Sequence, residues 1–380
     1  MKTRKLFAWS LPALLLACGS HAVDLEGERV PQITASIEPG VVALIDEQVT
    51  SLGVDDERLY WAGTWQEANI GTRGALRSCQ KTSCANSLIT YDARRVMYGL
   101  GFFLLRGEVF WLQTEDQRHA TLHACSVAGC DYGSRSVASF VLDDPTVMIQ
   151  GADAAYVSVA GYGDYGGSDF DPAVYRISLG LGDTTPTVID RPSGVVLALA
   201  VHDDYLYWLE APQRVATNQT EYFSGQMLQR TLADGSGSPQ LLANNLILEG
   251  GNAQRLIIDR DYAYWSENEL YGSISRCPLR GCADPSAPEA FLQPVRSPTT
   301  LWLDAGNLYW AHDTSAAGYG ISACRISSCT PVAVVAPGLG DRDATTFDDT
   351  SVYAAATAQE TSAADGSVTL PLRRFPKVVP

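Results

Sequence analysis

Apolar and aromatic residues recur along the chain in a three-residue pattern. In most copies an apolar residue is followed by Tyr or Phe and then by Trp. The seven copies are Leu59-Tyr60-Trp61, Val109-Phe110-Trp111, Ala155-Tyr156-Val157, Leu206-Tyr207-Trp208, Ala263-Tyr264-Trp265, Leu308-Tyr309-Trp310 and Val352-Tyr353-Ala354. Their last residues lie 44–57 residues apart. This spacing is close to the period of about 40–50 residues that is typical when the repeating unit is one four-stranded blade.

Each copy also contains further short apolar stretches separated by turn residues. One such stretch precedes the Tyr-Trp strand (residues 300–303), and two follow it (for example 272–277 and 331–335). Adjacent Tyr and Trp side chains point to opposite faces of a strand, so both faces of each sheet must be covered. Blades stacked around an axis cover both faces. The pattern therefore predicts an all-β protein, a seven-bladed β-propeller of four-stranded antiparallel blades.

The last copy lacks an outer strand, because the chain ends soon after Ser367–Leu370. The segment 40–45 resembles the missing strand and precedes the first inner strand near Val49–Leu52. We expect this N-terminal strand to close the last blade and to leave no open sheet edge. The predicted organisation is a signal and tether region over 1–22, a linker over 23–39, the propeller over 40–375 and a tail over 376–380.

The Tyr-Trp repeats resemble those of the YWTD and TolB-like propeller families and of bacterial lipoproteins built from them. The resemblance covers roughly residues 40–375 and implies the propeller fold. It departs from the YWTD pattern, because Thr-Asp follows Tyr-Trp in none of the copies and there are seven copies rather than six. We therefore do not carry over the receptor function of that family.

The N-terminus has the features of an export signal. Basic residues within 2–5 precede an apolar stretch over residues 6–17, which is too short for a membrane-spanning helix of about 20 residues. The stretch ends in Leu15-Leu16-Ala17-Cys18, which resembles a bacterial lipobox and implies acylation of the Cys18 thiol, for example with palmitate. The alternative is ordinary signal-peptidase cleavage after Ser20-His21-Ala22. We favour the lipobox, and Gly19 then favours a lipid anchor at the outer membrane or cell surface.

Eight of the nine cysteines form four pairs, each with four residues between the partners. The pairs are Cys79/Cys84, Cys125/Cys130, Cys277/Cys282 and Cys324/Cys329. An even set of close pairs in an exported chain predicts four local disulfides. Zinc is the competing interpretation, but a structural zinc site needs four converging ligands, and these pairs lie far apart in sequence.

Charge and composition limit the partners. Lys and Arg number 27 against 43 Asp and Glu, which gives a formal net charge of −16. Nucleic-acid binding requires clustered basic residues, and no basic run follows residue 5, so we exclude that partner class. The acidic balance favours a neutral or cationic partner or a divalent ion. We expect a monomer that contacts a membrane only through its lipid anchor.

The sequence shows no obvious catalytic motif. His119 and His123 have helical metal-ligand spacing, but their setting is extended and lacks the Glu of a zinc-protease motif, so we predict surface histidines. Aspartates or a histidine recur six residues before the last position of five copies. They are Asp55, His202, Asp259, Asp304 and Asp348. A catalytic ring is one interpretation, and the favoured one is that the aspartates cap the turn between the first and second strands.

The most unusual segment is the Gly-, Tyr- and Asp-rich stretch 161–172 in the third copy. It contains Tyr162, Asp164, Tyr165, Asp169 and Asp171. The favoured interpretation is a solvated loop. The alternatives are a Ca²⁺ site formed by the three carboxylates, because Ca²⁺ prefers oxygen ligands, and a Tyr-rich contact surface.

The next copy has a long loop over 211–225 that carries Tyr222 and Phe223. Loops on a rigid scaffold are common recognition sites. The sequence therefore predicts a non-catalytic lipoprotein of the cell envelope, a scaffold that binds a protein, peptide or glycan and needs no cofactor other than the Ca²⁺ considered above. The alternative is an exported hydrolase or lyase whose catalytic residues converge in the propeller channel.

Overall fold

The computed structural model describes residues 41–45, 47–67, 71–92, 101–114, 119–130, 133–141, 145–159, 172–180, 184–212, 215–217, 220–222, 226–246, 256–267, 272–313, 319–339, 344–355 and 370–377. The chain divides into two compact units, residues 1–30 and 31–380, and all described residues belong to the second. No helix among the described residues is long and apolar enough to cross a membrane.

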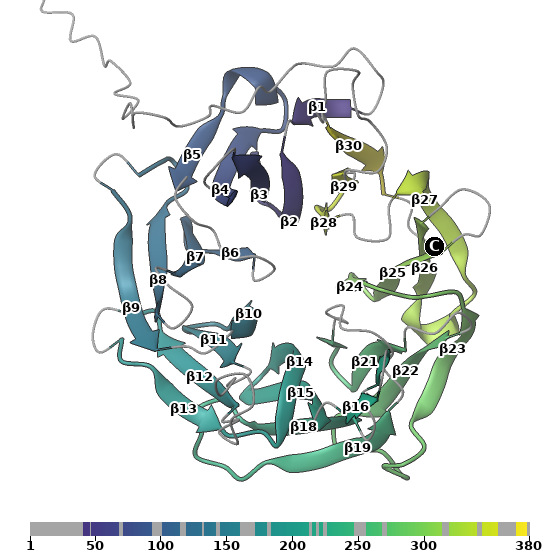
Figure 1. The fold of residues 1–380 in the computed structure, drawn as a ribbon. Helices are drawn as coiled ribbons and strands as arrows, with labels where there is room; N and C mark the ends of the chain where they lie inside the picture. Colours follow the sequence, from purple (N-terminus) through teal and green to yellow (C-terminus); the bar gives the residue numbers. More distant parts are fainter. Residues whose placement is uncertain are drawn as a thin grey trace, which may run out of the picture. The chain divides into compact units, whose positions relative to one another are not determined.

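Within the second unit, seven four-stranded antiparallel sheets follow one another around a ring (Figure 1), as the sequence predicts. Blade 1 comprises β2 (Gln48–Val54), β3 (Arg58–Glu67), β4 (Gly71–Gln80) and β5 (Ile89–Asp92). Blade 2 comprises β6 (Phe102–Leu105), β7 (Glu108–Thr114), β8 (His119–Ser126) and β9 (Arg135–Val141). Blade 3 comprises β10 (Pro145–Gln150), β11 (Ala154–Val159), β12 (Ala173–Ser178) and β13 (Thr187–Asp190).

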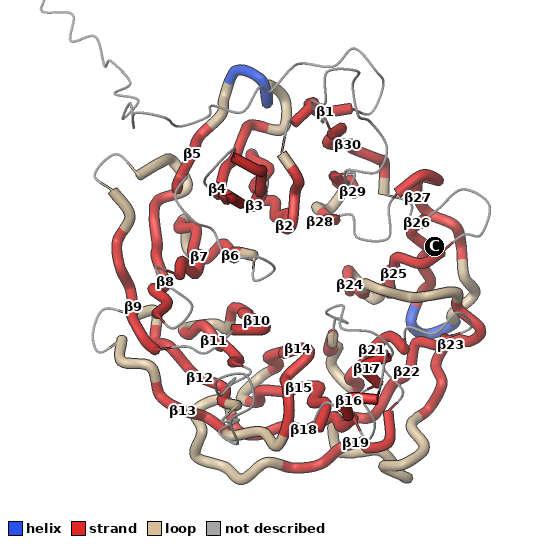
Figure 2. The backbone as a smooth tube through the Cα atoms, viewed as in Figure 1, coloured by secondary structure: helices blue, strands red, loops and turns tan. Residues whose placement is uncertain are grey.

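Blade 4 comprises β14 (Gly194–His202), β15 (Tyr205–Pro212), β18 (Gln226–Leu232) and β19 (Gln240–Leu246), with a small hairpin of β16 (Val215–Thr217) and β17 (Thr220–Tyr222) between its second and third strands. Blade 5 comprises β20 (Ile257–Ile258), β21 (Tyr262–Glu267), β22 (Gly272–Pro278) and β23 (Glu289–Val295). Blade 6 comprises β24 (Leu301–Asp304), β25 (Asn307–Asp313), β26 (Tyr319–Arg325) and β27 (Val332–Leu339). Figure 2 shows strands throughout, with two short 3₁₀ helices, η1 (Cys84–Asn86) and η2 (Ile326–Ser328).

Blade 7 is closed by the N-terminal strand, as predicted. It comprises β28 (Ala344–Phe347), β29 (Ser351–Ala355), β30 (Leu370–Pro376) and β1 (Val41–Ile45). In the pairing of β1 with β30, Ile45 lies opposite Leu370 and Ala43 lies opposite Leu372. Among the described residues the third strand begins at Leu370, and residues 367–369 of the expected strand lie outside the described residues. Its two prolines stand near the strand ends, where a missing N–H is best tolerated.

The Tyr-Trp pattern packs neighbouring blades together. Trp61 lies in one buried cluster with Tyr353 of blade 7, and Tyr60 lies in another with Trp111 of blade 2. The arrangement repeats around the ring, because the aromatic residue of one blade packs against the Trp position of the next in every cluster. All five Trp residues of the repeat are almost completely buried. Each such large aromatic side chain removes about 150–250 Å² from water.

Every blade ends its third strand in the same way. In blades 1, 2, 5 and 6 this residue stands two positions after the first cysteine of the pair, and the other blades have an equivalent residue. Its backbone N–H donates to a carbonyl in the turn between the first and second strands, at 2.8–3.0 Å. The seven donors are Lys81, Val127, Leu179, Ala233, Leu279, Ile326 and Lys377. The same residues contact the preceding blade. For example, Tyr91 of blade 1 donates its hydroxyl to the Val127 carbonyl at 2.6 Å.

All four predicted disulfides are present, and each spans the turn after a third strand. They join Cys79 to Cys84, Cys125 to Cys130, Cys277 to Cys282 and Cys324 to Cys329. The bridges therefore enclose the residue that contacts the preceding blade in blades 1, 2, 5 and 6.

Candidate functional site

Most loop residues proposed from the sequence lie outside the described residues. These are Cys18, Tyr162, Asp164, Tyr165, Asp169, Asp171 and Phe223. The stretch 161–172 falls between β11 and β12, as expected. Tyr222 ends β17, so part of the expected 211–225 loop forms a hairpin. Among the residues that the structure describes, no group of three or more His, Cys, Asp or Glu side chains could hold a metal ion.

The recurring aspartates cap turns, as favoured from the sequence. The Asp55 carboxylate accepts hydrogen bonds from the backbone N–H groups of Glu57 and Arg58 at 2.9 and 2.7 Å, and from the Tyr60 hydroxyl at 2.6 Å. Asp259 and Asp348 repeat this arrangement with Tyr264 and Tyr353. Each of these aspartates thus fixes its turn and anchors the buried Tyr of the repeat.

Asp304 departs from the arrangement. Its turn continues through Ala305 and Gly306 at positive φ, and its carboxylate pairs with the Lys377 ammonium of blade 7. The hydroxyl of buried Tyr309, the counterpart of Tyr60, has no hydrogen-bond partner among the described residues. The Lys377 ammonium lies 5.7 Å from the Tyr309 ring centroid.

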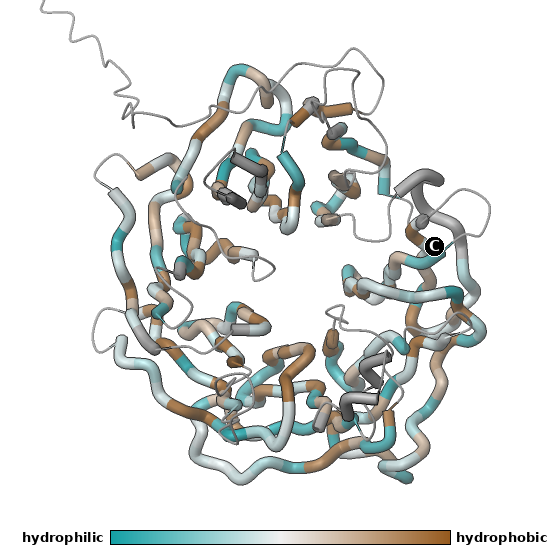
Figure 3. The backbone as a smooth tube through the Cα atoms, viewed as in Figure 1, coloured by the Kyte–Doolittle hydropathy of each residue, from teal (hydrophilic) through white to brown (hydrophobic). Residues whose placement is uncertain are grey.

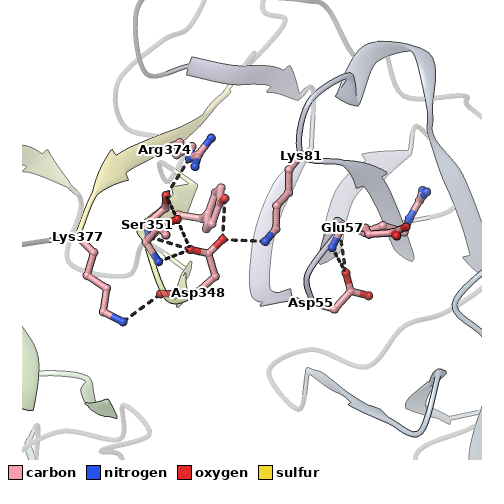
Figure 4. A network of polar contacts seen from close by, with 10 residues as sticks. Asp55, Glu57, Lys81, Asp348, Ser351, Arg374 and Lys377 are labelled. Carbon is pink, nitrogen blue, oxygen red and sulfur yellow. Dashed lines mark hydrogen bonds and ion pairs between the residues drawn. The ribbon is translucent and has the colours of Figure 1, made fainter. Parts of the chain in front are cut away.

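Figure 4 shows the polar network around Asp348, where blade 7 meets blade 1. The Lys81 ammonium donates to the Asp348 carboxylate at 2.7 Å, and the Lys377 ammonium donates to the Asp348 carbonyl at 3.0 Å. Burial acts to raise the pKa of Asp348, but the bonds from Lys81, from the backbone and hydroxyl of Thr350 and from Tyr353 outweigh it and hold that pKa well below its ordinary value. The network is fully paired, which indicates a structural role.

The innermost strand of each blade carries few ionisable side chains among the described residues. Figure 3 shows a hydrophobic run along β14, and ionisable side chains on the described inner strands β2, β6, β10, β14, β20, β24 and β28 are limited to His202 and Asp304. Both residues stand at the ends of their strands. Of the residues considered for a catalytic ring, these described inner strands therefore carry only His202 and Asp304.

A second recurring polar group lies beside the buried Trp residues, near the opposite ends of the second strands. In blade 4, buried Glu210 accepts bonds from Ser193 at 2.5 Å, from the Trp208 ring N–H at 3.2 Å and from Gln229 at 2.7 Å. The Asp190 carboxyl is close by, and burial and then the Glu210 charge raise its pKa above the ordinary value, against a backbone hydrogen bond from Arg191.

In blade 1 the carboxylate comes from a different part of the chain. Glu47, just before β2, accepts bonds from the Trp61 ring N–H at 3.2 Å and from Arg77 at 2.6 Å. Gly63 occupies the position that Glu210 has in blade 4, and a Cβ there would lie 2.4 Å from the Glu47 carboxylate. Blade 5 carries Glu267 at this position, bonded to the hydroxyls of Ser273 and Ser275 at 2.7 and 2.9 Å.

In blade 6 the same position holds a histidine, which forms a serine–histidine pair. The His312 Nε2 atom lies 2.8 Å from the Ser322 hydroxyl, and Nδ1 lies 3.1 Å from the Asp313 carbonyl oxygen. A carbonyl can only accept, so Nδ1 carries the proton and Ser322 donates to Nε2. Burial lowers the pKa of His312 below its ordinary value, against the raising effect of the Asp313 contacts. Burial thus favours the neutral form of the imidazole.

This arrangement has the geometry of a nucleophile beside its general base. The base accepts a hydrogen bond from the hydroxyl, and its second nitrogen is oriented by an acceptor. An ion pair stands next to it, with Arg296 3.1 Å from the Asp313 carboxylate. Sequence reasoning missed the pair because it depends on the pairing of β25 with β26, in which Trp310 lies opposite Ser322 and His312 lies opposite Gly320.

The other histidines proposed from the sequence lie in different surroundings. His119 and His123 both lie on β8, as the extended setting predicts, and His119 is exposed at the start of that strand. His123 is half-buried, with its ring stacked at 5.6 Å on that of Trp111, so it is not a simple surface residue. Its Nδ1 lies 3.1 Å from the Ser134 hydroxyl.

Comparison with solved structures gives matches among propellers of peptidases. The propeller domain of the trilobed protease from Pyrococcus furiosus, which has an open velcro topology, matches with a TM-score of 0.55 and 7% identity, over 87% of this chain and 95% of that one. The acylaminoacyl peptidase of Pyrococcus horikoshii matches with a TM-score of 0.59 and 8% identity, over 87% and 52% of the two chains. A puromycin-hydrolysing peptidase of Mycobacterium tuberculosis matches with a TM-score of 0.56 and 14% identity, over 87% and 54%.

This chain therefore spans about half the length of the latter two peptidases. At these identities the likeness shows a shared fold. Neither family models nor characterised proteins match the sequence.

The comparisons correct one prediction from the sequence. The three solved structures described above belong to peptidases, which contradicts a non-catalytic scaffold and agrees better with the alternative, a hydrolase.

Proposed function

We propose that the protein is an exported hydrolase of acyl compounds, with peptides as its substrate class, in which Ser322 is the nucleophile and His312 the general base. The observation that carries the proposal is the 2.8 Å contact between the Ser322 hydroxyl and His312 Nε2. The fold shared with peptidases supports the choice of substrate class.

The proposed chemistry follows from the protonation state of the pair. The Ser322 oxygen attacks the carbonyl carbon as its proton moves to Nε2, and His312 then gives that proton to the leaving amine or alcohol. Water hydrolyses the resulting ester and returns the serine. The Asp313 carbonyl at Nδ1 holds the imidazole in the tautomer that the first step requires and stabilises the imidazolium.

The alternative is a purely structural role, in which Ser322 and His312 serve only to pack blade 6. Blade 5 offers a matched comparison, because Ser275 lies opposite Trp265 as Ser322 lies opposite Trp310. Ser275 bonds a carboxylate and not a histidine. Replacing either serine by alanine removes a similar hydrogen bond, so loss of activity from Ser322→Ala alone separates catalysis from packing.

The test is labelling with a fluorophosphonate, a small probe that suits a serine only 8% exposed. We expect wild type and Ser275→Ala to be labelled, with the modified peptide mapping to Ser322 by mass spectrometry, and Ser322→Ala to remain unlabelled. His312→Gln should slow labelling by about 10²–10⁴-fold, the usual contribution of a general base. Equal labelling of wild type and Ser322→Ala, or none of the wild type, would remove the proposal.

We also propose that the chain is a lipoprotein of the bacterial cell envelope, anchored through Cys18 and related to the YWTD and TolB-like propellers. The support is the lipobox resemblance of residues 15–18, the Tyr-Trp repeats and the four disulfides, which are typical of exported chains.

A further inference from the structure

We propose that the Cys79–Cys84 disulfide is a redox-sensitive clamp on the closure of the propeller ring. The closure is the junction of blade 7 with blade 1, where β30 pairs with β1 and where β28 and β29 contact β2. The six other junctions are between blades that directly follow one another in the chain. Here the C-terminal strands are held to the N-terminal part by non-covalent contacts.

Lys81 crosses this junction from inside the disulfide loop. Its ammonium bonds the Asp348 carboxylate of blade 7 at 2.7 Å and lies 5.7 Å from the Tyr353 ring centroid. The Lys81 and Asp348 side chains are only 12% and 19% exposed. A largely desolvated ion pair contributes only while both partners are held in place, because separation leaves charges in a poorly hydrated site.

The loop holds Lys81 by its two ends. The backbone N–H of Lys81 bonds the Glu57 carbonyl at 3.0 Å, and Cys79 and Cys84 are both buried in the cluster that contains Trp61 and Tyr353. The disulfide thus ties the residues on either side of Lys81 to the core of the junction.

The other three disulfide loops carry an uncharged residue at the position of Lys81. Val127 accepts a hydrogen bond through its backbone carbonyl, as does Leu279, and Ile326 packs in an apolar cluster. In these three loops the residue at the Lys81 position therefore contributes a backbone carbonyl or an apolar side chain, and the charged donor to Leu279 is Arg230 of blade 4, outside the loop. At the position of Lys81, two residues after the first cysteine, only the Cys79–Cys84 loop carries a charged side chain, and that side chain forms the ion pair with Asp348.

The opposite side of the junction has its own anchor, which keeps the proposed opening partial. Arg77 precedes Cys79 by two residues on β4 and bonds Glu47, in the connection from β1 to β2. Loss of the Lys81 contact therefore leaves one side of the junction joined. Asp348 also keeps its bonds from the backbone of Thr350 and Ser351, so no charge is left without a donor.

The switching step is thiol–disulfide exchange with a dithiol reductant. One thiolate of the reductant attacks a sulfur of the bridge and forms a mixed disulfide, and its second thiolate displaces the remaining cysteine. The products are two protein thiols and one disulfide in the reductant, with two electrons and two protons transferred. The freed 80–83 segment then no longer holds Lys81 against Asp348.

The experiment is hydrogen exchange on the full-length protein followed by mass spectrometry. The variants are Cys79→Ser/Cys84→Ser, the matched control Cys277→Ser/Cys282→Ser in blade 5, and Lys81→Met with all bridges intact. Wild type is also compared with and without dithiothreitol, with alkylation to identify the reduced cysteines. We expect amides of β1 and of residues 348–355 to exchange at least tenfold faster in the first variant and in Lys81→Met, and at the wild-type rate in the control.

Lys81→Met keeps the clamp testable even if the double cysteine variant does not fold. Wild-type exchange at the junction in Lys81→Met would overturn the proposal. Equal acceleration at the junction by both pairs of cysteine substitutions would also overturn it, because the effect would then be general loss of stability. Reduction of Cys79 and Cys84 by dithiothreitol without faster exchange at β1 would do the same.

Discussion

Replacing Glu47 by glutamine tests the charge balance of the buried contact between β1, β2 and β4. Glu47 and Arg77 are both 1% exposed and lie 2.6 Å apart. Glutamine keeps the shape and an acceptor for the Trp61 ring N–H, but it removes the charge opposite Arg77. Removing the charge of one partner from a buried ion pair costs about 3–5 kcal/mol. We therefore expect Glu47→Gln to lower the free energy of unfolding by about that amount.

Glu210→Gln is the matched control. Glu210 has the same place beside its Trp, but its hydrogen-bond donors are the neutral groups of Ser193, Trp208 and Gln229. Glutamine is uncharged, so the substitution also removes the repulsion between Glu210 and Asp190. We expect a change of within about 1 kcal/mol, because the shape and most of the bonds remain.

The assay is urea unfolding followed by fluorescence of the eight Trp residues. With a slope of about 3 kcal/mol/M, the Glu47→Gln midpoint should fall by about 1–2 M, and the Glu210→Gln midpoint by less than about 0.5 M. The double variant Glu47→Gln/Arg77→Met should recover much of the loss, since no buried charge remains. Equal midpoints for Glu47→Gln and Glu210→Gln would refute the reasoning, because the Arg77 charge would then have no measurable consequence.

Three further predictions concern activity, anchoring and closure. If His312 is the base, kcat/KM should fall at acid pH with an apparent pKa below the ordinary histidine value of 6.5. Burial favours the neutral form, so activity is lost only as the pH drops through that lowered pKa. Loss of activity with an apparent pKa above 6.5 would contradict this. Labelling cells with radioactive palmitate should mark wild type and not Cys18→Ala, and equally little label in both would reject the lipobox. Deleting residues 23–46 removes β1 and exposes the β30 edge, so the melting temperature should fall and aggregation rise; an unchanged melting curve would contradict the stabilising role of the closure.

The fold was largely predictable because its signals are local and repeated. Adjacent Tyr and Trp require burial on both faces of a strand, and seven copies with turn residues between them leave few other architectures. The closure by residues 41–45 followed from the missing strand of the last copy. The disulfides followed from the spacing of the cysteines and from the compartment that the N-terminus implies.

The polar groups beside the Trp residues could not be predicted in the same way. Their partners meet through strand register, as His312 and Ser322 do across β25 and β26, or through a connection between blades, as Glu47 does with Arg77. The Glu210 position is Gly63 in blade 1, where the carboxylate comes from elsewhere in the chain. A position-by-position comparison of the repeats therefore does not show that Glu47 and Glu210 have the same role. Gly63, directly after Trp61-Ala62, was nevertheless a signal that another group occupies the place of its side chain.

The packing of each aromatic residue against the Trp position of the next blade makes every junction a head-to-tail contact. Such a contact is the same wherever it occurs, so it does not by itself record which two blades belong together. Charged side chains at the two junctions of blade 7 supply that information, through Lys377 with Asp304 and Lys81 with Asp348. A misplaced blade would bring an apolar Ala, Val, Leu or Ile to these aspartates and leave them without a cation. The last blade to be completed is thus the one whose neighbours are recognised by charge, which disfavours pairing of blade 7 with the wrong blades.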